Sequence, residues 1–282
     1  MRVSGDSNAV LGYLRLFRLG NCVMAALGAL LAAVACIGFE GLEDFVVEIL
    51  LSMAIVICFT AAGNSYNDYF DREVDKVAHP DRPIPRGQVS PAGAMYVAYV
   101  LFLTAVLLSV IVSIVSVIIV ITSIIVMVGY ERFLKAEGLA GNLAISWLTG
   151  ALFLFGGAAV ESLELAWILA ALAFLATLGR EIVKDIQDID GDRGTRVTLP
   201  MKVGPRKAGT VASIAFIIAV AMSPSPFLLG LMSVWYLPVV MVADGIFIYA
   251  ASILFRSPEK GQKVSKLAMF VALLAFLIGG IL

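Results

Sequence analysis

Long apolar runs alternate with short polar segments along most of the chain. Runs near 22–39, 45–66, 139–160, 163–182 and 264–282 are each long enough for a membrane-spanning helix, which needs about 20 mostly apolar residues. Residues 91–129 carry no charged side chain and would form a helix of about 58 Å, roughly twice the ~30 Å hydrocarbon core. We therefore expect two spans there, separated near Ser113.

A second long run, 208–255, contains the sequence Ser223-Pro224-Ser225-Pro226. Proline removes a backbone donor and clashes with the preceding helical turn, so this run should also divide into two spans. The pattern predicts an all-α membrane protein with about nine transmembrane helices in a bundle around a central cavity. We expect a single transmembrane domain over residues 1–282.

Composition agrees with this prediction. Hydrophobic residues make up 61% of the chain, charged residues only 15%, and the mean hydropathy is +0.98. A soluble protein of this size cannot accommodate that balance, so the bilayer is the expected solvent. The formal net charge of −1 argues against a nucleic-acid partner.

Positive charges are confined to alternate loops. All 20 Lys and Arg residues lie either before the first predicted span or in the segments after spans two, four, six and eight. The other loops carry acids such as Glu43 and Glu161 instead. Because Lys and Arg collect on the cytoplasmic side of short loops, we expect a cytoplasmic N-terminus, an external C-terminus and a multi-pass protein of the cell membrane.

Two segments that follow spans two and six, 64–90 and 180–207, each contain three aspartates with the spacing D-x-x-D-x-x-x-D. The first triad is Asp68, Asp71 and Asp75, and the second is Asp185, Asp188 and Asp192. If the preceding helix continues into each segment, offsets of three and seven place the three carboxylates on one helix face. Both triads follow even-numbered spans, so we expect them on the cytoplasmic side, as in a parallel repeat of a four-helix unit.

Carboxylates gathered in this way require a bound cation. Two such charges about 6 Å apart repel each other by about 3 kcal/mol at an effective dielectric constant of ~20. Mg²⁺ is usually held by one or two carboxylates together with water and phosphate oxygens. Because Arg72, Arg82, Arg180 and Lys184 are interleaved with the triads, the pattern favours a metal-bridged phosphate compound over a bare cation site.

Two other interpretations fit parts of this pattern. The charges could be ordinary solvated loop residues that obey the positive-inside rule, although the repeated spacing argues against that. Clustered carboxylates among spans also mark transporters of divalent cations or phosphate compounds. Many transporters use inverted repeats with binding sites at the bilayer midplane, whereas this repeat is parallel and its carboxylates lie near one surface.

Several of these strings resemble the UbiA superfamily of intramembrane prenyltransferases. They are Asn67-Asp68-x-x-Asp71-x-x-x-Asp75, Arg82-Pro83-Ile84-Pro85-Arg86-Gly87, the segment from Tyr130 to Lys135, and the second triad. The likeness covers nearly the whole chain. Within the superfamily, the opening Arg15–Asn21 and the segment 180–188 are most similar to the archaeal digeranylgeranylglyceryl phosphate synthases.

The resemblance implies which residues form the site. Mg²⁺ would be held by the six aspartates, Asp68, Asp71, Asp75, Asp185, Asp188 and Asp192, and catalysis would use these residues with Lys135. Substrate would be bound by Asn21, Asn64, Asn67, Arg72, Arg18, Arg82, Tyr130, Arg180 and Lys184. Metal and cations would stabilise the charge on the departing diphosphate, while apolar helices protect the allylic carbocation from water.

The resemblance also implies the substrates. The prenyl donor would be geranylgeranyl diphosphate, and the lipid acceptor would be geranylgeranylglyceryl phosphate, which reacts through its free hydroxyl group. The alternative is an aromatic acceptor of the hydroxybenzoate, naphthoate, chlorin or haem type.

Overall fold

The computed structural model describes the backbone of residues 3–192 and 196–282, and the side chains of residues 10–191 and 196–282. Its elements, in chain order, are α1 (Val3–Phe17), α2 (Leu19–Ile37), η1 (Glu40–Phe45), α3 (Val46–Ala78), α4 (Pro91–Val112), α5 (Ile114–Arg132), η2 (Leu134–Ala136), α6 (Leu139–Ala159), α7 (Leu163–Gln187), α8 (Ile189–Asp192), α9 (Leu199–Val203), α10 (Pro205–Met222), α11 (Ser225–Leu228), α12 (Tyr236–Ile253) and α13 (Pro258–Ile281). In the described part of the chain, nine helices are long and apolar enough to cross a membrane. This confirms the predicted all-helical membrane fold and its nine spans.

Both predicted helix breaks are present. Ser113 has extended backbone angles, with φ −170° and ψ 161°, and separates α4 from α5. The Ser-Pro-Ser-Pro segment ends α10, and α12 begins only at Tyr236. Two residues of α12 fasten this connection: the Tyr236 hydroxyl donates to the carbonyl oxygen of Ser223 at 2.7 Å, and the Ser223 hydroxyl donates to Asp244 Oδ2 at 2.6 Å.

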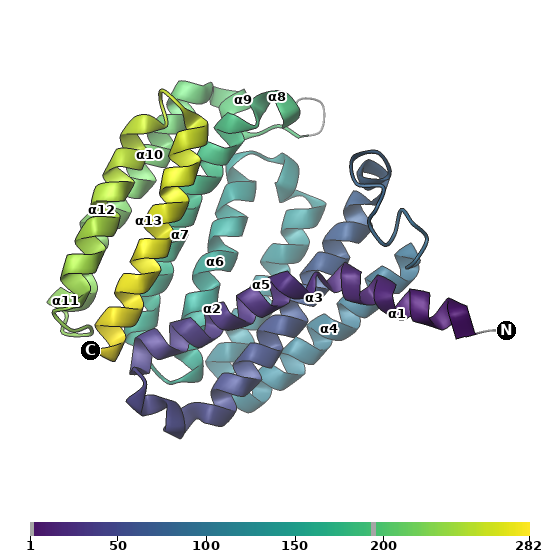
Figure 1. Cartoon of the computed structure of the whole chain (residues 1–282), viewed down its shortest axis with the longest axis horizontal. Coiled ribbons are helices and arrows are strands. Elements are labelled where there is room, and N and C mark those ends of the chain that lie inside the picture. Colours follow the sequence, from purple (N-terminus) through teal and green to yellow (C-terminus); the bar gives the residue numbers. More distant parts are fainter. Residues whose placement is uncertain (1–2, 193–195) are drawn as a thin grey trace. The chain divides into compact units, whose positions relative to one another are not determined.

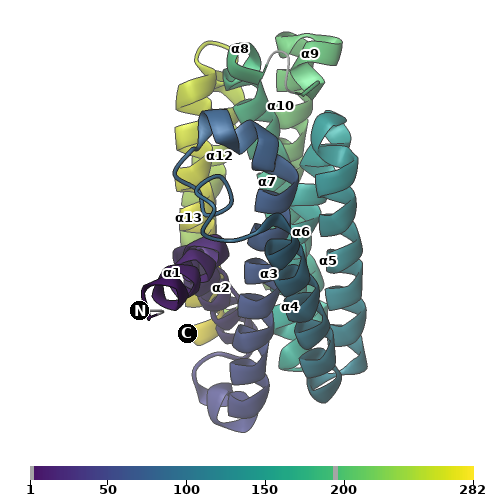
Figure 2. The ribbon, with the colours of Figure 1, turned by 90° about the vertical axis from the view of Figure 1, so that its right-hand side faces the viewer.

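The chain divides into two compact units. Unit 1 comprises residues 1–30 and 47–132, with α1, the first part of α2, and α3 to α5. Its core joins Ala62 and Tyr66 of α3 to Phe102 of α4, and Figure 2 shows α4 lying beside α5. A separate small cluster packs Leu16 of α1 against Ile84, which attaches the loop after α3 to the N-terminal helix.

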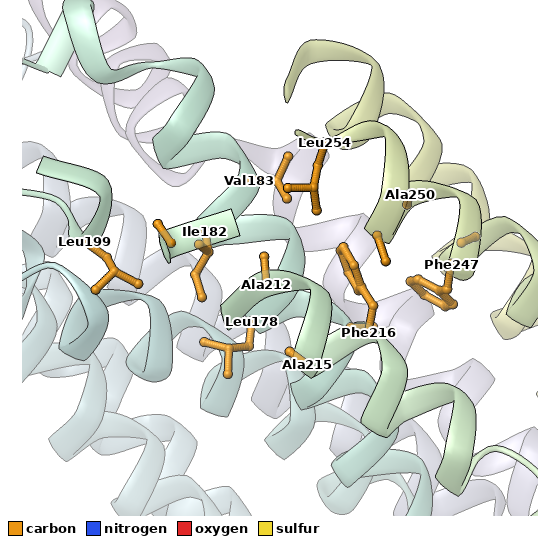
Figure 3. Packing of buried hydrophobic residues seen from close by; sticks show 14 residues of the cluster. Leu178, Ile182, Val183, Leu199, Ala212, Ala215, Phe216, Phe247, Ala250 and Leu254 are labelled. Atoms are coloured by element: carbon orange, nitrogen blue, oxygen red, sulfur yellow. The ribbon is translucent and has the colours of Figure 1, made fainter. Parts of the chain in front are cut away.

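Unit 2 comprises residues 31–46 and 133–282, in which α6, α7, α10, α12 and α13 pack side by side (Figure 1). Its main apolar cluster joins α7 to α10, α12 and the residue that follows α12 (Figure 3). Ile182 and Val183 of α7 are fully buried there, as is Phe216 of α10. Apolar residues therefore hold α7 against α10 and α12.

Glycine allows α6 to approach α7 closely. A Cβ atom at Gly157 would lie 2.3 Å from Ala166 Cβ, and one at Gly150 would lie 2.8 Å from the carbonyl oxygen of Ala170. Small residues serve this purpose in membranes, where close van der Waals packing rather than the hydrophobic effect holds helices together.

Two helices extend beyond their apolar segments and carry the aspartates. The 33-residue α3 continues to Ala78 and includes the whole first triad. The 25-residue α7 continues to Gln187 and is capped by Asp188. The helical continuation on which a shared carboxylate face depends is therefore present for the first triad. The prediction is wrong for the second triad, because α7 ends before Asp188 and Asp192 belongs to the separate short helix α8. The single domain, the cytoplasmic N-terminus and the parallel repeat stay predictions.

Candidate active site

The first triad lies on α3 in unit 1, and two of its carboxylates are buried against arginines. Asp68 is only 2% exposed and Asp75 only 3% exposed. Arg18 forms an ion pair and hydrogen bond with Asp68. The Arg82 guanidinium lies 2.5 Å from Asp75 Oδ2 and 3.6 Å from Asp68 Oδ1, so it bridges the two carboxylates.

The position of this triad on its helix makes such cations necessary. Asp75 lies in the last turn of α3, where the helix dipole is negative and disfavours anions. A buried carboxylate also loses its hydration and requires a charged or hydrogen-bonding partner. The site therefore favours bound positive charge.

Local structure brings the two arginines to the carboxylates. Arg18 has a positive φ of 51° and separates α1 from α2, and such a conformation is uncommon for a residue other than glycine. The amide of Asn64 on α3 donates to the carbonyl oxygen of Phe17 at 2.8 Å and so holds this joint. Arg82 lies in the loop that Ile84 attaches to α1.

The middle aspartate has different surroundings. The Asn67 side chain donates to Asp71 Oδ2 at 3.1 Å and to Glu131 Oε1 at 2.8 Å. Glu131, at the end of α5, is only 8% exposed. Our sequence analysis missed it, because its neighbour in sequence, Arg132, makes the pair look like part of a solvated loop.

One predicted residue of unit 1, Arg72, has other partners. The Arg72 side chain turns back along α3, where it donates to the carbonyl oxygen of Tyr69 at 2.8 Å and lies 4.5 Å from the centre of the Tyr69 ring. Asn21 is exposed on α2, and Tyr130 is half-buried near the end of α5. The structure brings together Arg18, Asn64, Asn67, Arg82 and the first triad, but not Arg72.

The second triad begins on α7 in unit 2. Asp185 is 5% exposed and accepts a hydrogen bond of 3.0 Å from the amide of Asn142 on α6. Asp188 is the C-cap residue of α7 and is half-buried. The side chain of Asp192 lies outside the described residues.

Three predicted cations belong to unit 2. Lys184 is half-buried one turn before Asp188, and its offset of four residues places it on the same helix face. Arg180 pairs with Glu181, whose side chain is 12% exposed, and our sequence analysis had not included Glu181. Lys135 is half-buried in η2, directly before α6.

The first triad offers ligands of the kind that a divalent cation uses. Among the described residues, no three His, Cys, Asp or Glu side chains already converge as a complete metal site. Mg²⁺ does not require such a cage, since it commonly uses one or two carboxylates with water and phosphate oxygens. The donors are carboxylate oxygens, and arginine charge already pairs with Asp68 and Asp75. These residues therefore fit Mg²⁺ in ligand type, with Asp68 and Asp75 paired to arginine in this structure.

Comparison with known proteins identifies the family of the chain. Residues 21–274 match the model of the UbiA prenyltransferase family. The digeranylgeranylglyceryl phosphate synthase of Natronomonas pharaonis is 39% identical over 272 residues, which cover 96% of this chain and 97% of that protein.

Solved structures show the same fold. A structure of a digeranylgeranylglyceryl phosphate synthase in membranes has a TM-score of 0.89 and 34% identity, covering 97% of this chain and 99% of that one. A UbiA homologue from Archaeoglobus fulgidus, bound to GPP and Mg²⁺, has a TM-score of 0.65 at 15% identity, covering 95% of this chain and 98% of that one. Nine candidate spans among the described residues, the aspartate triads and the family match lead to one assignment: the chain belongs to the UbiA prenyltransferase family and is a multi-pass membrane prenyltransferase.

Proposed function

We propose that this prenyltransferase transfers a geranylgeranyl group from geranylgeranyl diphosphate to the free hydroxyl of geranylgeranylglyceryl phosphate, in a Mg²⁺-dependent reaction of archaeal ether lipid synthesis. The observation that carries this proposal is the pair of aspartate triads, one in the last turns of α3 and one that begins at the end of α7, each accompanied by cationic side chains. The acceptor is supported by the synthase of Natronomonas pharaonis, which aligns with nearly the whole chain.

Charge stabilisation is the task of the polar residues. Asp68, Asp71, Asp75, Asp185, Asp188 and Asp192 would hold Mg²⁺, which supplies Lewis-acid stabilisation of the leaving diphosphate when bound. Lys135 and Lys184 add positive charge for the diphosphate oxygens, and Arg180 is a further candidate. Asn67 keeps Asp71 in place through its hydrogen bond. Fixed charges of this kind stabilise a transition state without reorganisation.

The apolar part of each helix has a different task. The residues of α3 and α7 that precede the triads are mainly apolar. A prenyl tail that lies along them would be in surroundings without water. An allylic carbocation reacts with any water present, and a dry environment preserves it for the acceptor hydroxyl. The alternation of Lys and Arg between loops supports a reaction on the cytoplasmic side of the cell membrane.

The proposal is tested with purified protein in lipid nanodiscs. Radiolabelled dimethylallyl, geranyl and geranylgeranyl diphosphates are each incubated with geranylgeranylglyceryl phosphate, hydroxybenzoate, naphthoate and haem precursors, with and without Mg²⁺. We expect labelled product from the geranylgeranyl donor and the glyceryl phosphate acceptor, and none after chelation of Mg²⁺. Product on an aromatic acceptor alone would instead support the alternative acceptor class, and activity in the absence of any divalent cation would contradict the metal requirement.

A further inference from the structure

Arg18 and Arg82 occupy the carboxylate oxygens that a divalent cation requires. Arg18 pairs with Asp68, and Arg82 lies against both Asp68 and Asp75. The arginine side chains are 32% and 27% exposed, whereas the aspartate side chains are 3% and 4% exposed. The guanidinium groups therefore approach from the accessible side toward buried carboxylates.

Other cations of the same region have different partners. Lys76 pairs with Glu73 at 2.7 Å, Arg86 pairs with the exposed Asp81, and Arg72 lies over Tyr69. The pairing of Arg18 and Arg82 with the triad is thus selective. Both also belong to irregular backbone, Arg18 at the left-handed joint between α1 and α2 and Arg82 in the turn after α3. Side chains on such segments can change direction without disturbing a helix.

A guanidinium and a Mg²⁺ ion compete for these oxygens. A carboxylate offers about four lone-pair positions, but a small hydrated cation beside two arginines would bring three positive groups into one pocket. Entry of the cation therefore favours release of the guanidinium groups from Asp68 and Asp75. Released arginines carry planar donor arrays suited to a phosphate group.

We propose that Arg18 and Arg82 are placeholders for the divalent cation and turn to the phosphate of the acceptor when Mg²⁺ and the prenyl diphosphate bind. This inference rests on the proposed function, because it assumes an acceptor that carries a phosphate. It predicts an order of binding, with Mg²⁺ and donor first and acceptor second. An aromatic acceptor without a phosphate would gain nothing from the released arginines.

Removing the arginine charge should strengthen Mg²⁺ binding and weaken acceptor binding. Mg²⁺ binding is measured calorimetrically on the full chain in nanodiscs, without donor or acceptor, for wild type, Arg18→Gln and Arg82→Gln. We expect both variants to bind Mg²⁺ about fivefold or more tightly, at the lower end of usual coupling between sites, because a competing cation is gone. Arg15→Gln is the matched control, since Arg15 is exposed one turn earlier, and its Mg²⁺ affinity should equal that of wild type.

Acceptor binding supplies the second half of the test. Binding of geranylgeranylglyceryl phosphate is measured with and without Mg²⁺ and a thiolodiphosphate analogue of the donor, which does not ionise. In wild type, we expect Mg²⁺ and the analogue to strengthen acceptor binding about fivefold or more, and we expect Arg18→Gln to remove most of that gain. Should Arg82→Gln fail to fold, Arg18→Gln remains informative, because Arg18 has its own ion pair with Asp68.

The outcomes separate the inference from the proposed function. Weaker or unchanged Mg²⁺ binding in Arg18→Gln would overturn the placeholder role, because arginines that only support the fold or assist the metal do not compete with it. Acceptor binding that is independent of Mg²⁺ and donor would also overturn it, while leaving the proposed acceptor in place. Wild-type protein that binds no geranylgeranylglyceryl phosphate under any of these conditions would contradict the proposed function and the inference together.

Discussion

Asp71 and Asp188 allow the charge of each triad to be tested separately, since Asp→Asn replaces one oxygen by nitrogen at nearly constant size. Loss of one preorganised stabiliser typically lowers kcat by about 10²–10³-fold. We expect losses of this order in Mg²⁺-dependent diphosphate release for Asp71→Asn and for Asp188→Asn. The measurement is release of labelled diphosphate under saturating donor and acceptor.

Two neighbouring acids provide the controls for this comparison. Asp81 lies in the loop after α3 with an 83% exposed side chain, and Asp190 is exposed on α8. Asp81→Asn and Asp190→Asn should retain near wild-type rates. Full activity in Asp71→Asn or Asp188→Asn would show that the triads are ordinary charged segments.

Among single residues, the aspartates could be predicted from the sequence, but the residues that hydrogen-bond with their surroundings could not. Spacing of three and seven is a local signal, so the first triad could be predicted on one face of α3, whereas the end of α7 before Asp188 could not. Asn142 contacts Asp185 across 43 residues, and Asn67 contacts Glu131 across 64 residues. No local pattern indicates such pairs, because tertiary packing brings them together. The contact of Arg72 with Tyr69 is local, since the two residues are one turn apart on α3.

Individual elements followed the apolar pattern where the pattern was long. The breaks at Ser113 and at the Ser-Pro-Ser-Pro segment could be predicted from span length and proline chemistry. Helix α13 begins at Pro258, earlier than the apolar run, because Ser257 caps it through the Lys260 amide at 3.4 Å. Hydropathy marks the part of a helix that lies in lipid, whereas capping residues mark where the helix begins. Asp244 is an acid within an apolar run. Its hydrogen bond with Ser223 depends on the folded structure and could not be predicted from the sequence.

The contact between α6 and α7 can be tested by one substitution made at two glycines. At Gly157, a new Cβ would lie 2.3 Å from Ala166 Cβ, whereas at Gly245 of α12 nothing lies within 4 Å. Gly157→Ala should lower the free energy of unfolding by about 1–3 kcal/mol through overpacking. Gly245→Ala should raise it by about 0.5–1 kcal/mol, because alanine is the better helix former.

Reversible denaturation in mixed micelles measures both glycine variants under the same conditions. Opposite signs would support the close helix contact, since both substitutions add the same methyl group. Equal effects at Gly157 and Gly245 would mean that α6 and α7 pack more loosely than described.

For the whole molecule, charge distribution predicts which loops face the cytoplasm. The test uses a variant without Cys22, Cys36 and Cys58, with one new cysteine at an exposed position. Glu43→Cys and Val234→Cys should react with a membrane-impermeant maleimide on intact cells. Lys260→Cys should react only after the cells are opened.

This labelling pattern also tests the number of spans. Positions 43 and 260 are separated by an odd number of the nine candidate spans among the described residues, so they should lie on opposite sides. Labelling of both positions from outside would require one span more or fewer. It would also mean that the connection between α12 and α13 does not face the cytoplasm.

The length of α3 has a consequence for where products go. Its 33 residues extend about 50 Å at 1.5 Å per residue, while the hydrocarbon core is ~30 Å thick. Asp68, 22 residues after Val46, lies about 33 Å along the axis, so a helix that enters the hydrocarbon at Val46 would bring it to the headgroups on the other side. Bond cleavage at that depth would sort its own products by solubility: pyrophosphate dissolves into the aqueous phase, and the two-tailed lipid stays in its leaflet without crossing the bilayer.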